Sequence, residues 1–187
     1  MSQRRTPGWN PARTWAFVVG ILEWKHDDMF VSFPKENRRD AALVDLFQSL
    51  GIPKEHIIYL QDRQATTRRI QQTFETHLAK ARAGDLLLVY FTGHGDRNDD
   101  GSAYFASYDT DCDTNLGWVV DTIPATIEQR FGGSRALLFA DCCCSGSLID
   151  SVAQQARRVG YACLASSLAN EASTGNWTFT EDLIAGL

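Results

Sequence analysis

The sequence has neither an excess of basic residues nor a long apolar run. Its 187 residues carry a formal net charge of −5, which argues against a nucleic-acid-binding protein, because such proteins need a basic face that neutralises phosphates. The apolar run Trp15–Leu22 is too short to cross a bilayer, and charged Glu23 and Lys25 follow it where a secretory signal would have small residues. We therefore expect neither a nucleic-acid partner nor a membrane partner.

The sequence also lacks the cysteine pattern of a disulfide framework. It has five cysteines, and three of them are consecutive, Cys142, Cys143 and Cys144. Consecutive cysteines do not offer the C-x-x-C geometry of a zinc site, and the chain is long enough to fold around a core without disulfides. Because we recognise no export signal, we expect reduced thiols and a cytoplasmic location.

Short apolar segments alternate with segments of helical period, which is typical of a parallel sheet with crossover helices. The predicted strands are residues 15–22, 57–60, 86–91, 137–140 and 161–165. The predicted helices are residues 37–50, 66–83 and 122–131, and a last helix capped by Thr180. The polar interval 96–121 is interpreted as a surface excursion with a small hairpin around residues 104–106. Since the sequence stops soon after Thr180, we expect a single α/β domain, residues 1–187, that lacks its C-terminal end.

Two predicted loops carry the residue types of nucleophilic catalysis. Residues 86–91 run into Thr92-Gly93-His94-Gly95, and residues 137–140 run into Asp141-Cys142-Cys143-Cys144-Ser145-Gly146. Functional residues of an open parallel sheet collect at the carboxyl ends of the strands, so adjacent strands would bring an imidazole and a thiol together. An imidazole can activate a thiol, whose ordinary pKa of ~8.5 leaves little thiolate at neutral pH, and it can then protonate the leaving amine.

The blocks Tyr90–Gly95 and Asp141–Gly146 resemble the paired active-site blocks of the caspase and metacaspase family of cysteine peptidases, in which histidine and cysteine lie about 50 positions apart. The resemblance implies a caspase-like three-layer sandwich, a mostly parallel sheet with helices on both faces. It implies that Cys143 is the nucleophile, that His94 transfers the proton, and that the backbone N–H groups of Gly95 and Cys143 bind the oxyanion.

The sequence departs from the metacaspase pattern at the residue after the nucleophile. Metacaspases usually have histidine there, and this sequence has Cys144. A second thiol beside the nucleophile would allow redox control. The alternative is that Cys142 and Cys144 are only small, partly buried side chains.

The resemblance also implies which peptide bond is cleaved. Metacaspases have acidic residues in the pocket for the residue before the cleaved bond (P1), and Asp141 and Asp40 occupy similar positions here. Two carboxylates would favour a guanidinium group, so we expect cleavage after arginine and less well after lysine. We place Thr92 and Trp177 in the same substrate-binding group. The alternatives are that Asp40 only interacts with a helix dipole and that Trp177 is a core residue.

Calcium and self-cleavage are two further expectations from the resemblance. The chemistry needs no cofactor, but many metacaspases need calcium bound by aspartates in the region of residues 96–121, for which Asp99, Asp100 and Asp121 are the candidates. Polar surface loops are often acidic for other reasons, and the spacing does not match an EF-hand. Arg157-Arg158 lies between two predicted strands, where the family tends to be cut.

Two other functions stay open for the same fold. A caspase-like domain can serve as a non-catalytic interaction domain, and the three consecutive cysteines could form a thiol redox sensor. The favoured partner is a protein or peptide substrate with a basic P1 residue.

Overall fold

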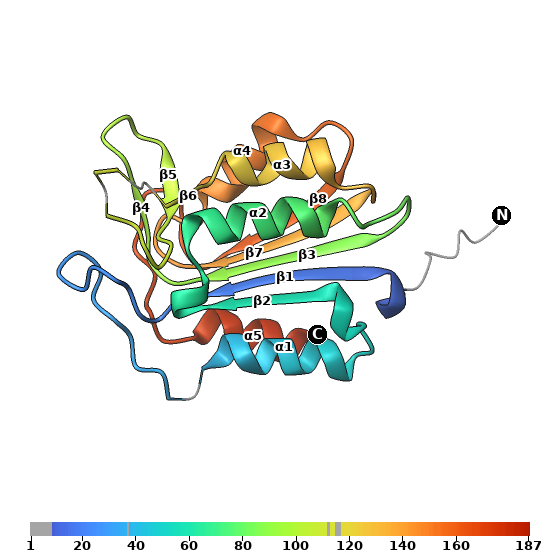
Figure 1. The fold of residues 1–187 in the computed structure, drawn as a ribbon, viewed down its shortest axis with the longest axis horizontal. Coiled ribbons are helices and arrows are strands. Elements are labelled where there is room, and N and C mark those ends of the chain that lie inside the picture. Colours follow the sequence, from blue (N-terminus) through green and yellow to red (C-terminus); the bar gives the residue numbers. More distant parts are fainter. Residues whose placement is uncertain (1–8, 37, 112, 115–116) are drawn as a thin grey trace.

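The computed structural model describes residues 9–36, 38–111, 113–114 and 117–187. Five parallel strands form its central sheet, in the order β2-β1-β3-β7-β8 (Figure 1). These strands are β1 (Thr14–Gly20), β2 (Ile57–Gln61), β3 (Leu86–Thr92), β7 (Arg135–Asp141) and β8 (Gly160–Ala165). The predicted strands are confirmed to within one or two residues at most ends, and the adjacency of β3 and β7 is confirmed as well.

Helices cover both faces of the sheet, which confirms the three-layer α/β sandwich (Figure 1). One layer contains α1 (Arg39–Ser49) and α5 (Thr178–Gly186), and the other contains α2 (Thr67–Leu78), α3 (Thr122–Arg130) and α4 (Ser147–Gln155). β1 and β3 are buried along their whole length, because each contributes alternate side chains to the two apolar layers. In the described residues no helix has both the length and the apolar character needed to cross a membrane.

The helix boundaries differ from the predicted ones in three places. The helix predicted for residues 37–50 is α1, which begins at Arg39, and Asn37 lies outside the described residues. The helix predicted for residues 66–83 ends earlier, at Leu78. Thr180 does not cap α5, which begins at Thr178, because the Thr180 hydroxyl is buried and bonds to other side chains.

α4 was not predicted from the sequence. It follows directly after the cysteine loop, and its buried positions include the small polar residues Ser147 and Ser151 beside Leu148 and Val152. Leu148 and Val152 are spaced four residues apart on the buried face, so the sequence does carry a helical apolar period here. The predicted elements did not include it.

The hairpin predicted around residues 104–106 is confirmed, but several described residues of the interval 96–121 are buried in the core, so its interpretation as a surface excursion was wrong for them. Its described residues form an antiparallel sheet of β4 (Gly95–Arg97), β5 (Ala103–Phe105) and β6 (Trp118–Val119). Tyr104, Phe105 and Trp118 are buried, and the Trp118 ring packs edge-on against Phe74 of α2 with centroids 5.4 Å apart. These aromatic side chains fix the small sheet beside the carboxyl ends of the main strands.

Candidate active site

A cavity of about 610 Å³ lies at the carboxyl ends of β1, β3 and β7. The residues after β3 and β7 form two of its walls, and residues 173–177 before α5 form another. Of the predicted site residues, the cavity brings together Thr92, His94, Asp141, Cys143 and Trp177. Side chains that are far apart in the sequence meet here because β3 and β7 are adjacent and in register, with Thr92 opposite Asp141.

The His94 imidazole is held on two sides. Its Nε2 lies 2.9 Å from the carbonyl oxygen of Val31, and its ring packs against Phe33 and Trp24, with centroids 4.5 and 4.6 Å away. A carbonyl oxygen can only accept a hydrogen bond, so Nε2 carries the proton and Nδ1 is left with a lone pair. Burial among the aromatic rings lowers the pKa of His94. The neutral imidazole can therefore act as a base at neutral pH.

Cys143 lies in a turn that neighbouring backbone groups hold in place. The N–H of Cys144 donates to the Glu171 carbonyl (2.9 Å), and the Ser167 hydroxyl donates to the Cys142 carbonyl (3.0 Å). Cys143 Sγ accepts a hydrogen bond from the Ser173 N–H at 3.4 Å.

The two neighbouring cysteines differ from Cys143 in their surroundings. Cys142 is buried, and its burial raises the pKa of the thiol well above the ordinary value. Desolvation also raises the pKa of Cys144, whose backbone is left-handed at φ 55°. Both thiols are therefore less ionised than an exposed cysteine, and of the two only Cys142 contributes to the cavity wall.

Gly95 allows the two loops to touch. A Cβ atom at Gly95 would lie 2.2 Å from the carbonyl oxygen of Cys143 and 3.0 Å from Cys142 Sγ. Any larger residue would push the histidine loop away from the cysteine loop. The sequence placed Gly95 and Cys143 together as the oxyanion donors, and the structure places their backbones in contact; their role stays a prediction.

Asp141 is the carboxylate of the predicted pocket that reaches the cavity. Its Oδ2 accepts a hydrogen bond from the Thr180 hydroxyl (2.6 Å), which is itself 2.6 Å from the Tyr90 hydroxyl. The Thr92 hydroxyl donates to the Asp141 backbone carbonyl (3.2 Å). Other charged residues of the cavity wall are Glu36, Arg39 and Glu181. Because Arg39 forms an ion pair with Glu181 (2.7 Å), the acidic side chains that remain in the cavity wall are Asp141 and Glu36.

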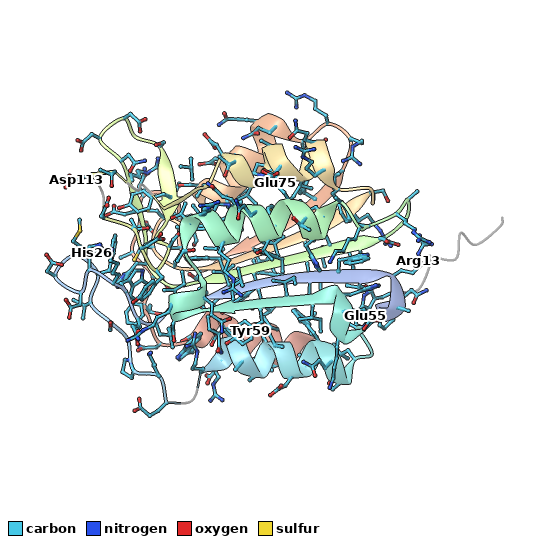
Figure 2. The ribbon with its side chains drawn as sticks, viewed as in Figure 1. Arg13, His26, Glu55, Tyr59, Glu75 and Asp113 are labelled. Atoms are coloured by element: carbon cyan, nitrogen blue, oxygen red, sulfur yellow. The ribbon has the colours of Figure 1, made fainter. Side chains whose placement is uncertain are left out.

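The structure does not bring Asp40 into this cavity. Asp40 is fully buried in the first turn of α1, and both of its carboxylate oxygens bond to Arg38. The Tyr59 hydroxyl, between β2 and α1 (Figure 2), also donates to it, at 2.7 Å. Asp40 is absent from the described residues that line the cavity.

The three candidate calcium ligands do not form a common site in the described part of the chain. Asp100 accepts from the backbone N–H and the hydroxyl of Ser102 (2.9 and 2.6 Å), while Asp121 precedes α3. No group of three or more His, Cys, Asp or Glu side chains in the described ranges could hold a metal ion. These residues, as they stand, do not fit a calcium ion, and a calcium requirement stays a prediction.

Sequence reasoning missed the groups that orient the site. Val31 acts through its backbone carbonyl, and Ser173 through its backbone N–H, so neither side chain gives a signal in the sequence. Thr180 was assigned to a helix cap, although its hydroxyl bonds to Asp141. Arg38 gives no signal in the sequence either, although its side chain is only 12% exposed and pairs with Asp40.

Comparison with known proteins identifies the family. Residues 46–152, which include both His94 and Cys143, match the model of the metacaspase, peptidase C14 domain. This match covers more than half of the chain, and the chain belongs to the metacaspase family of peptidase C14.

Two curated relatives come from Arabidopsis thaliana. Metacaspase-4 is 29% identical over 120 residues, which are 59% of this chain and 28% of the relative. Metacaspase-7 is 30% identical over 129 residues, 64% of this chain and 31% of the relative. The chain thus spans less than a third of the length of either protein.

A solved structure is similar in fold. Protein GSU0716 from Geobacter sulfurreducens superimposes with a TM-score of 0.53 at 18% identity, over 91% of this chain and 64% of that chain. At this identity the likeness supports the fold alone.

Proposed function

We propose that this protein is a cysteine endopeptidase that cleaves peptide bonds after basic residues, arginine before lysine, through Cys143 and His94. One observation carries the proposal: both side chains line one cavity at the carboxyl ends of two adjacent strands, together with the Asp141 carboxylate. Membership of the metacaspase peptidase C14 family supports the cysteine peptidase class.

The first half of the reaction forms an acyl-enzyme. His94 Nδ1 takes the proton of the Cys143 thiol, and the thiolate attacks the carbonyl carbon of the peptide bond. The resulting oxyanion accepts hydrogen bonds from the backbone N–H groups of Gly95 and Cys143. The C–N bond then breaks, and the imidazolium gives its proton to the leaving amine. The Val31 carbonyl holds the ring through Nε2 in both protonation states.

The second half releases the product. His94 removes a proton from a water molecule, which attacks the thioester, and the imidazolium then returns this proton to the departing Cys143 sulfur. The products are a peptide with a new carboxyl terminus and the free enzyme. All proton transfers go through one imidazole, which matches its position between the aromatic rings and the cavity.

The charge of the cavity supports a basic P1 side chain. Asp141 directly precedes the cysteine loop, and Glu36 adds a second negative charge to the wall. A guanidinium group can bond to a carboxylate with charge-assisted hydrogen bonds, and an ammonium group gains a similar attraction with fewer donors. Trp177, which is half-buried in the same wall, offers an apolar surface for the alkyl part of the side chain.

Self-processing is part of the same proposal. Arg157 and Arg158 lie in the exposed connection between α4 and β8. Intact-mass measurement of the active protein would detect cleavage after either residue, and an active enzyme that stays intact would contradict this part.

The test compares fluorogenic peptides that end in arginine, lysine or aspartate, with and without calcium. We expect the parent protein to release the fluorophore after arginine, less after lysine and not after aspartate. Cys143→Ala should be inactive, and Cys144→Ala, the matched control, should retain activity. A folded parent protein without activity in either condition would favour the non-catalytic interaction domain. Peroxide-reversible disulfide formation without peptidase activity would favour the redox sensor.

A further inference from the structure

Arg38 has a largely buried side chain, and its guanidinium group bonds to two carboxylates and a backbone carbonyl. Its Nε and Nη2 donate to the two carboxylate oxygens of Asp40, at 3.1 and 2.8 Å. Its Nη1 lies 2.6 Å from Asp62 Oδ2, and Nη2 also donates to the Gly20 carbonyl at 2.8 Å. The Arg38 side chain is 12% exposed and the Asp40 side chain is fully buried. This is a bidentate ion pair inside the protein, shared with a second carboxylate.

The pair lies near the cavity but outside its wall. Gly20 is the last residue of β1, and it is in register with Thr92 of β3, which is in register with Asp141 of β7. A Cβ atom at Gly20 would lie 1.7 Å from Asp40 Oδ2, so the Asp40 carboxylate lies directly against this row of residues. Asp40 and Asp141 are thus at the same edge of the sheet, two strands apart.

The two carboxylates differ in what neutralises them. Asp141 accepts a hydrogen bond from a neutral hydroxyl, that of Thr180, and lies in the cavity wall. Asp40 already has a cation of its own. A substrate cation that bound Asp40 would have to displace Arg38. The guanidinium group of Arg38 would then lose one of its two carboxylate partners and keep only Asp62. Such a displacement is strongly unfavourable.

We propose that Arg38 is a specificity-determining residue, which neutralises Asp40 from within the chain and leaves Asp141 as the carboxylate that attracts the basic P1 side chain. This inference rests on the proposed function. It follows that the Arg38–Asp40 pair, which lies outside the cavity wall, adds no net charge to the pocket while it is intact. Removing the guanidinium alone would make the field at the cavity more negative.

The test uses Arg38→Met, the double variant Arg38→Met/Asp40→Asn, and Asp141→Asn on peptides ending in arginine and aspartate. Arg38→Met should lower KM for the arginine peptide by about 3-fold or more with kcat unchanged, because an uncompensated carboxylate attracts the cation. The double variant should return to within about 2-fold of the parent KM. Asp141→Asn should raise KM by about 10-fold or more.

Each outcome supports or overturns the specificity role of Arg38. An unchanged or higher KM for folded Arg38→Met overturns the proposal, and so does a double variant that loses its arginine preference, since Asp40 would then contact the substrate. If Arg38→Met does not fold, the KM and the arginine preference of the double variant are compared with those of the parent instead. A parent protein that does not cleave after arginine refutes the proposed function, and the specificity role with it.

Thermal melting tests the internal pair without any activity measurement. Asp40→Asn alone should lower the melting temperature by about 6 °C or more, because it leaves a buried guanidinium short of a partner. The double variant removes both charges, and Asp62 keeps Lys35 within 3.3 Å. It should therefore melt at a higher temperature than Asp40→Asn. A double variant that melts at the same or a lower temperature contradicts the pairing.

Discussion

A buried histidine, His77, and a half-buried histidine, His94, lie at opposite ends of the sheet. His94 follows β3 at the end where the loop containing His26 lies, and His77 is in the last turn of α2, packed against Trp15 near Arg13 (Figure 2). Burial lowers the pKa of both, that of His77 to about 4. His94 bonds to the Val31 carbonyl and lines a cavity with Cys143. The ring nitrogens of His77 have no hydrogen-bond partner among the described residues.

The comparison shows that a lowered pKa does not by itself identify a catalytic histidine. Both rings are desolvated by aromatic neighbours, yet only His94 has a fixed tautomer, a nearby thiol and space for a substrate. The distinguishing feature is the position at the carboxyl end of a central parallel strand. A perturbed histidine elsewhere is explained by packing alone.

The largest expected effect separates the two histidines by activity. His94→Ala should lower kcat/KM for an arginine peptide by about 10³-fold or more, because the proton acceptor and donor is lost. His77→Phe, the matched control, should change kcat/KM by less than about 2-fold, since phenylalanine fits the aromatic surroundings. Comparable losses of kcat/KM in the two variants would show that His94 and His77 do not differ in their contribution to activity.

A second prediction concerns the contact between the two loops. Gly95→Ala should lower kcat/KM by about 10²-fold, because the new methyl group would overlap the Cys143 carbonyl and displace the histidine loop. Gly186→Ala is the control, since no atom lies within 4 Å of a Cβ there. Steady-state kinetics of both variants would check this, and full activity of Gly95→Ala would show that the loops are not held in this arrangement.

A third prediction concerns stability in acid. The folded pKa of His77 is about 4, below its unfolded value of 6.5, so the unfolded state binds a proton first as the pH falls. The contribution of His77 to stability is present above pH 6.5 and is lost between pH 6.5 and 4, by about 2 kcal/mol from pH 7 to pH 5. Urea unfolding of the parent and of His77→Phe at both pH values would measure this loss. Equal losses in the two proteins would contradict it.

The smallest effect is the position of the acid limb of activity. Because burial lowers the pKa of His94, the imidazole should stay unprotonated below its ordinary value of 6.5, and kcat/KM should hold its plateau to a lower pH than an exposed histidine allows. A pH profile on the arginine peptide, recorded within the range where the protein stays folded, would show it. A limb with its midpoint above 6.5 would indicate that His94 is not buried in the free enzyme.

The positions of the five main strands and the meeting of His94 with Cys143 at one edge of the sheet were predictable from the sequence. The buried runs of β1, β3 and β7 have an apolar pattern, and the positions of His94 and Cys143 at strand ends follow from it. α4 was missing from the predicted elements, although Leu148 and Val152 recur at helical spacing on its buried face. Of the small antiparallel sheet, the sequence indicated the hairpin around residues 104–106 but not the burial of Tyr104 and Trp118, because polar loops surround these side chains.

The pairing of the charged groups at the site could not be predicted from the sequence. Asp40 and Asp141 are alike in the sequence, yet one is paired with Arg38 and the other faces a cavity. The tautomer of His94 depends on a backbone carbonyl 63 positions away, and no residue type encodes such a partner. Sequence patterns indicate which residues meet, whereas the pairing of each buried charge depends on three-dimensional packing.

Covalent labelling of Cys143 tests the central claim most directly. A peptide chloromethyl ketone that ends in arginine should add one label, on Cys143, and His94→Ala should label much more slowly. Burial raises the pKa of the Cys142 and Cys163 thiols, and desolvation raises the pKa of the Cys144 thiol. These three cysteines should therefore remain unlabelled. Peptide mapping that finds the label on another cysteine, or equal labelling rates with and without His94, would contradict the account.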